Sequence, residues 1–89
     1  MAFQYQFPAI AEPEELPKQL QHVKEEAYEA IEAYLNEESE WTLATELMDV
    51  IHAAETALRL LGMHESMLSG VKTNVIVKNN SRGYYGGGE

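Results

Sequence analysis

The chain of 89 residues has the length of one small domain, carries a formal net charge of −9 and contains no cysteine. A domain of this size buries little apolar surface, so we expect a marginal core and assembly into a homo-oligomer, either a homodimer or a homotetramer. Fifteen acidic residues against six basic ones argue against binding a nucleic-acid polymer, and the absence of cysteine excludes disulfides and thiolate zinc sites.

The amino terminus has no basic segment followed by an apolar run, and no window approaches eighteen consecutive apolar residues. We therefore expect a soluble, cytoplasmic protein without a membrane partner. Charge is unevenly distributed, because the segment between Ser66 and Gly88 has no acid but contains Lys72, Lys78 and Arg82. An acidic body with a basic end suits a metal ion in one place and a phosphate group in another.

Residues 1–12 are expected to form an extended arm, since Phe3, Tyr5 and Phe7 alternate and Pro8 follows them. These aromatic side chains would pack on a neighbouring helix or a second subunit, or stack on a nucleobase.

Residues 13–80 are expected to form a helical domain. Pro13 and Pro17 suit the first turn of a helix that would run to about Asn36, and the apolar residues on it follow a 3-4 spacing. A short polar connection, with Ser39 or Thr42 as a cap, leads to a second helix from about Trp41 to Leu61 that ends at Gly62. So short a loop forces an antiparallel hairpin.

The segment after Gly62 is ambiguous, because Val75, Ile76 and Val77 favour a strand while Met67, Leu68, Val71 and Val75 recur at helical spacing. We predict a shorter third helix, and hence an all-α fold assembled into an oligomeric bundle. Residues 81–89, rich in glycine and tyrosine, are predicted to be a flexible tail.

Four acids dominate the two long helices, namely Glu26 and Glu29 on the first and Glu46 and Asp49 on the second. Each pair is spaced i, i+3, which places both carboxylates on one face of a helix. On antiparallel helices the pairs converge, and two unit charges 4 Å apart repel by about 4 kcal/mol at an effective dielectric near 20. Oxygen-only ligands of this kind suit Mg²⁺, with Mn²⁺ as an alternative.

Written out, KEEAYEA is followed by ELMDV, with Glu25 as the first acid of an E-E-x-x-E motif and Glu46 and Asp49 forming E-x-x-D. This arrangement resembles the MazG-like nucleoside triphosphate pyrophosphohydrolases, the all-α NTP pyrophosphatases. The segment VIVKNNSRGYY is similar to the carboxyl-terminal part of small members. The resemblance covers both long helices and the end of the chain.

The resemblance implies hydrolysis of a nucleoside triphosphate to the monophosphate and pyrophosphate. It also implies that Glu26, Glu29, Glu46 and Asp49 bind Mg²⁺. Glu25 and Glu29 would be the catalytic residues, with Glu25 either supporting the metal ligands or helping to orient water. Substrate contacts would come from Lys78, Asn79, Arg82 and Tyr84, with Lys78 and Arg82 reaching the triphosphate.

Two other interpretations stay open from the residues alone. In the first, the chain is a non-catalytic acidic helical module that binds a nucleotide or a partner protein on the same scaffold. In the second, its acids only keep a helical oligomer soluble.

Overall fold

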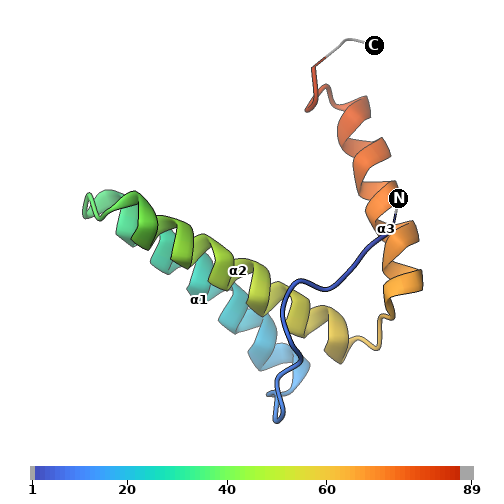
Figure 1. Cartoon of the computed structure of the whole chain (residues 1–89), viewed down its shortest axis with the longest axis horizontal. Coiled ribbons are helices and arrows are strands. Elements are labelled where there is room, and N and C mark those ends of the chain that lie inside the picture. The colour runs from blue at the N-terminus through green and yellow to red at the C-terminus, as the bar shows by residue number, and fades with distance from the viewer. Residues whose placement is uncertain (1, 87–89) are drawn as a thin grey trace. The chain divides into compact units, whose positions relative to one another are not determined.

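The computed structural model describes residues 2–86, which form three helices and no strand. The helices are α1 (Leu16–Leu35), α2 (Glu40–Leu60) and α3 (Glu65–Ser81) (Figure 1). The predicted all-α class is therefore confirmed. The chain divides into two compact units, a hairpin unit of residues 6–62 and an α3 unit that combines residues up to 5 with those from 63 onward.

The ends of α1 follow from local chemistry. The helix begins between the two prolines, with Pro17 in its first turn, where a missing N–H costs no hydrogen bond. Beyond the C-cap Asn36, Glu37 adopts a left-handed conformation with φ 55°. There the N–H of Glu37 donates to the carbonyl of Tyr34 at 3.0 Å, and that of Glu38 to the carbonyl of Ala33 at 3.0 Å. These paired bonds terminate the helix and turn the chain.

The boundaries of α2 match the predicted caps. Ser39 is the N-cap, and its hydroxyl oxygen accepts the N–H of Thr42 at 3.1 Å. At the other end Gly62 has φ 77°, a conformation that glycine adopts without steric cost. The short connection of residues 36–39 brings α2 back along α1, so the two helices pack as the expected antiparallel hairpin (Figure 1).

The core of the hairpin unit is built from small residues. Its buried apolar side chains are all alanines, namely Ala30, Ala33, Ala53 and Ala57. Among the described residues no large side chain is fully buried, whereas Leu20, Ile31, Leu47 and Ile51 are between 44% and 55% exposed. The 3-4 spacing of apolar residues on the first helix, to which Leu20 belongs, predicts one face turned to a core, and for Leu20 this is wrong in the single chain. Helices that meet through alanine approach closely but bury little apolar area.

The α3 unit is tied together by the start of the arm. The N–H of Phe3 donates to the hydroxyl of Ser69 at 2.9 Å, and that of Tyr5 to a carboxylate oxygen of Glu65 at 2.9 Å. The rings of Phe3 and Tyr5 meet edge to face, with centroids 5.1 Å apart. The first two arm aromatics thus pack within the chain, next to a helix whose buried residue is Leu68.

Helix α3 includes Val75, Ile76 and Val77, so helical periodicity prevails there over the β preference of these residues. It runs through Ser81 into the predicted tail, and residues 82–85 form a turn. Residues 87–89 of that tail lie outside the described residues. In the part of the chain that the structure describes, no helix has the length and hydropathy needed to cross a membrane.

Candidate metal centre

Three of the four acids predicted to bind a metal lie together between α1 and α2. Glu26 comes from α1, and Glu46 and Asp49 from α2; one carboxylate oxygen of each lies within 4.8 Å of the others. We call these three residues the acidic triad. The side chain of Glu26 is only 13% exposed, Glu46 is half-buried, and Asp49 is exposed. The triad therefore has a sheltered side between the helices and an open side toward solvent.

The triad is electrostatically unfavourable when no cation is bound. Burial raises the pKa of the Glu26 carboxyl above its ordinary 4.5, and the charges of Glu29, Asp49 and Glu25 raise it further, while His22 opposes the shift. Loss of hydration is likewise the largest cause of the raised pKa of Glu46, followed by the charges of Glu29, Asp49 and Glu26. A carboxyl with a raised pKa is in a site that disfavours its negative charge.

Two oxygens of the triad lack the partners that buried oxygens normally have. Oε1 of Glu26 and Oε1 of Glu46 are both buried and accept no hydrogen bond. Buried polar atoms without partners are uncommon in folded proteins and cost free energy. A divalent cation bound by both atoms would satisfy them and offset two of the three negative charges of the triad, so the donor set fits Mg²⁺ or Mn²⁺.

Glu29 and Glu25 lie at the edge of the triad. Glu29 is exposed and does not belong to the group of close oxygens, yet its charge is the largest charge contribution to the raised pKa of both Glu26 and Glu46. Glu25 is 58% exposed, and its carboxylate lies 3.8 Å from Nδ1 of His22. The E-E-x-x-E motif thus supplies one sheltered acid and two acids that face solvent.

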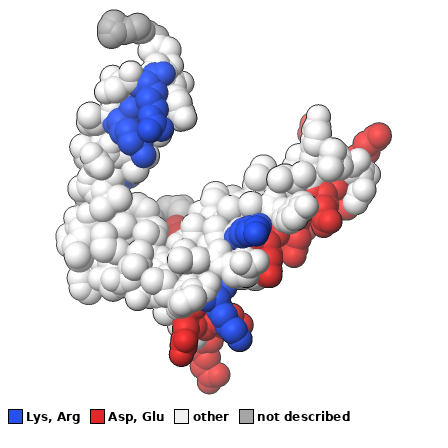
Figure 2. All heavy atoms as spheres, turned by 180° about the vertical axis from the view of Figure 1, so that it is seen from behind, with Lys and Arg blue, Asp and Glu red and all other residues white. Residues whose placement is uncertain are grey.

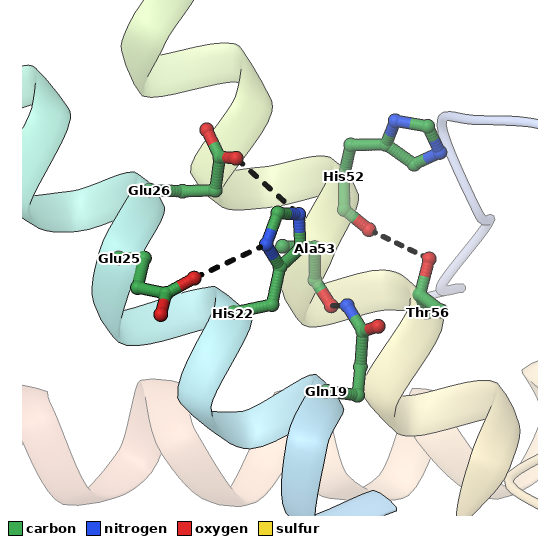
Figure 3. Close-up of polar contacts among 7 residues, drawn as sticks. All are labelled: Gln19, His22, Glu25, Glu26, His52, Ala53 and Thr56. Atoms are coloured by element: carbon green, nitrogen blue, oxygen red, sulfur yellow. Dashed lines mark hydrogen bonds and ion pairs between the residues drawn. The ribbon is translucent and has the colours of Figure 1, made fainter. Parts of the chain in front are cut away.

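His22 connects the two neighbouring glutamates of the motif. Its Nε2 lies 3.3 Å from a carboxylate oxygen of Glu26, and Figure 3 shows the imidazole between the carboxylates of Glu25 and Glu26. From the sequence, a surface or packing role is the more frequent one for such a histidine. Its i, i+4 spacing to Glu26 was the available signal. When protonated, His22 offsets part of the negative charge beside the triad.

A pocket of about 200 Å³ adjoins the triad on the hairpin unit. It is lined by Ile10, Gln19, His22, Glu26, Asp49, His52, Ala53 and Thr56. Two of its polar side chains are fixed, because Nε2 of Gln19 donates to the carbonyl of Ala53 at 3.0 Å and the Thr56 hydroxyl donates to the carbonyl of His52 at 3.1 Å (Figure 3). A larger hollow of about 440 Å³ touches His22 and Glu25 but no member of the triad.

Sequence reasoning missed four of these pocket residues, namely Ile10, Gln19, Ala53 and Thr56. Gln19 precedes Glu26 by seven residues and so lies on the same face of α1, which was a usable signal. Ile10 carried none, because its position follows from how the arm folds back on the helices.

The predicted substrate-binding residues all belong to the α3 unit. Lys78, Arg82 and Tyr84 are exposed, and Asn79 is half-buried. The carbonyl of Asn79 accepts the N–H of Arg82 at 3.1 Å and that of Tyr84 at 3.0 Å, which fixes the turn at the end of α3. Figure 2 shows a cluster of basic side chains on the α3 unit, and on the hairpin unit many acidic side chains together with some basic ones. Comparisons with known protein families, with curated proteins and with solved structures found no match to this chain.

Proposed function

We propose that the chain is a Mg²⁺-dependent nucleotide pyrophosphohydrolase that cleaves a ribo- or deoxyribonucleoside triphosphate to the monophosphate and pyrophosphate. The observation that carries this proposal is the acidic triad, whose oxygens converge within 4.8 Å while Glu26 and Glu46 each leave one buried oxygen without a partner. A solvated acidic face does not need this convergence.

In the proposed enzyme, Glu26, Glu46 and Asp49 hold the metal, and Glu29 completes the set from the open side. The bound ion supplies charge neutralisation on the phosphate oxygens and a lowered pKa for water. Glu25 and Glu29, which face solvent beside the triad, are the groups that orient the attacking water and accept its proton. His22 holds the Glu25 side chain toward Glu26.

The triphosphate is bound in this proposal by the basic end of α3. Lys78 lies in the last turn of α3, and Arg82 is the C-cap residue four positions later, so both belong to the same end of the helix. A guanidinium contacts two phosphate oxygens at once, whereas an ammonium acts as a point charge. Asn79 and Tyr84 lie beside them, and we propose that each contacts the sugar, the base or a phosphate of the substrate.

The proposed enzyme is a homo-oligomer, either a dimer or a tetramer. The alanine core of the hairpin unit buries little area, and Leu20, Ile31, Leu47 and Ile51 remain about half exposed. On α2, Leu47 and Ile51 are one turn apart, and on α1 Leu20 and Ile31 are eleven residues apart, which is close to three full turns, so each helix presents an apolar stripe that a second copy can cover. Covering these stripes would supply the burial that one chain lacks.

The test is release of pyrophosphate from a panel of canonical and modified nucleoside triphosphates, with Mg²⁺ and with EDTA. Asp49→Asn is expected to lower kcat at least about 100-fold, because even loss of a group that supports a metal ligand costs about 10- to 100-fold. Glu32→Gln is the matched control, since Glu32 is an exposed acid of α1 outside the triad. Absence of metal-dependent turnover across the panel would refute the enzymatic proposal and favour the non-catalytic binding module.

A further inference from the structure

The first residues of the hairpin unit are fastened to α2 by a buried carboxylate. Glu55 is 5% exposed, and its two oxygens accept the N–H of Gln6 at 3.1 and 2.9 Å and that of Phe7 at 3.0 Å. One turn later, Nη2 of Arg59 donates to the carbonyl of Phe7 at 2.8 Å. The Phe7 ring stacks on His52, with centroids 4.6 Å apart and planes 14° apart. We call these contacts the arm latch.

The latch explains how the carboxylate of Glu55 can be buried. A carboxylate removed from water is costly unless hydrogen bonds satisfy it, and here backbone N–H groups of the arm do so. The three latch residues of α2, His52, Glu55 and Arg59, recur at spacings of three and four and so share one face of the helix. The arm is therefore fixed to the same rigid helix that carries Asp49.

The latched arm contributes one wall of the pocket beside the acidic triad. Ile10, three residues after Phe7, lines this pocket together with Glu26 and Asp49. A buried cavity of about 150 Å³ accommodates a benzene ring, whereas whole drug-sized ligands occupy about 300 to 1,000 Å³. A pocket of about 200 Å³ thus suits a single ring of a larger ligand.

The lining of the pocket suits a sugar. Ile10 and Ala53 offer apolar contact for the ring carbons. Gln19 and Thr56 each donate to a backbone carbonyl, which leaves the Gln19 amide oxygen and lone pairs of the Thr56 hydroxyl as acceptors for ligand hydroxyl groups. In a nucleotide the pentose is the ring attached directly to the α-phosphate, so it is the ring that would lie next to a metal-bound phosphate.

We propose that this pocket is the pentose subsite and that Glu55 is a positioning residue, which holds the arm so that Ile10 closes the subsite. The inference rests on the proposed function. It goes further by naming the part of the substrate that the pocket takes and the residue that shapes it from outside.

The experiment compares wild type with Ile10→Ala and Glu55→Gln, using Glu32→Gln as the control for the second change. For a hydrolysed nucleoside triphosphate we expect both test variants to raise KM at least about 10-fold and to leave kcat nearly unchanged. The size follows because one methylene group in an apolar pocket already changes kcat/KM by about 10-fold. Inorganic tripolyphosphate with Mg²⁺ serves as a ligand that lacks the pentose, and its inhibition constant is expected to stay the same. Amide exchange at Gln6 and Phe7 should accelerate in Glu55→Gln alone.

If wild type is active, three outcomes overturn the inference. An unchanged KM in Ile10→Ala would show that the pocket does not contact the substrate. Equal weakening of nucleotide and tripolyphosphate binding shows a general structural effect. A loss of kcat in Glu55→Gln without a change in KM removes its positioning role. If wild type shows no turnover, the proposed function fails first and the pentose subsite fails with it, while amide exchange still reports whether the arm latch exists.

Discussion

Glu26→Gln separates a metal site from a solvated acidic face, because it removes one charge and keeps the shape of the side chain. Without metal, we expect the variant to be more stable than wild type, since the raised pKa of Glu26 shows that the folded protein disfavours its negative charge. With Mg²⁺ the order should reverse. Glu26 supplies one of the three converging oxygens, and a neutral amide replaces it poorly.

The size of the metal effect follows from linkage. A ligand that binds only the folded chain stabilises it by about 2.7 kcal/mol at a concentration one hundred times its Kd. Because 1 kcal/mol moves Tm by about 4–8 °C in a domain of this size, wild type should gain about 10–20 °C. If the variant binds Mg²⁺ about 100-fold more weakly, the gain at the same concentration falls to about 0.4 kcal/mol, or about 2–3 °C.

The assay is thermal unfolding followed by circular dichroism, with Mg²⁺ or Mn²⁺ titrated against an EDTA baseline at fixed protein concentration. Glu32→Gln is carried in parallel and should behave as wild type. A wild-type Tm that does not respond to either cation would refute the reasoning, and so would a Glu26→Gln variant that retains the full increase.

Three further predictions concern pH, assembly and phosphate binding. At pH values between the ordinary pKa of 4.5 and the raised pKa values of Glu26 and Glu46, these carboxyls bind more protons in the folded chain than in the unfolded chain. Their contribution to the free energy of unfolding therefore falls as pH rises through that range. In EDTA, a plot of Tm against pH should therefore decline less steeply for Glu46→Gln than for wild type; identical slopes would contradict the assignment. Ile51→Asp places a charge on the exposed apolar stripe of α2 and should shift the oligomer toward monomer in sedimentation velocity, whereas Thr45→Asp should not. Arg82→Ala should raise KM for the triphosphate about 10- to 100-fold, with partial retention in Arg82→Lys, and an unchanged KM would exclude a phosphate contact.

Local signals in the sequence were enough to predict α1 and α2. Prolines at the start of α1, Ser39 before α2 and Gly62 after it specify boundaries by backbone chemistry that depends on few neighbours. The convergence of Glu26 with Glu46 and Asp49 was also predictable, because it requires only the i, i+3 spacing and an antiparallel hairpin. The sequence could not place Glu29, since a small rotation of α1 decides whether that acid joins the triad or faces solvent.

The arm latch could not be predicted from the sequence, for a different reason. Glu55 stands between Ala54 and Thr56, in a stretch that also holds His52 and Arg59, and an acid there is equally compatible with an exposed helix face. Its partners, Gln6 and Phe7, lie 49 and 48 residues away in sequence. No periodicity relates an extended arm to a helix at that distance, so the pairing is visible only in the folded chain.

The alanine core and the acidic triad are two consequences of the same close helix packing. Each helix has an acid one turn before a buried alanine, Glu26 before Ala30 on α1 and Asp49 before Ala53 on α2. Small side chains let the helices approach, and this approach brings carboxylates from both within 4.8 Å. The same packing limits apolar burial and increases charge repulsion, so the isolated chain loses stability on both counts. In the proposed enzyme, a bound cation would relieve the repulsion and a second copy of the chain would supply the missing burial. Both would stabilise the same hairpin, so metal binding and subunit association are expected to strengthen each other.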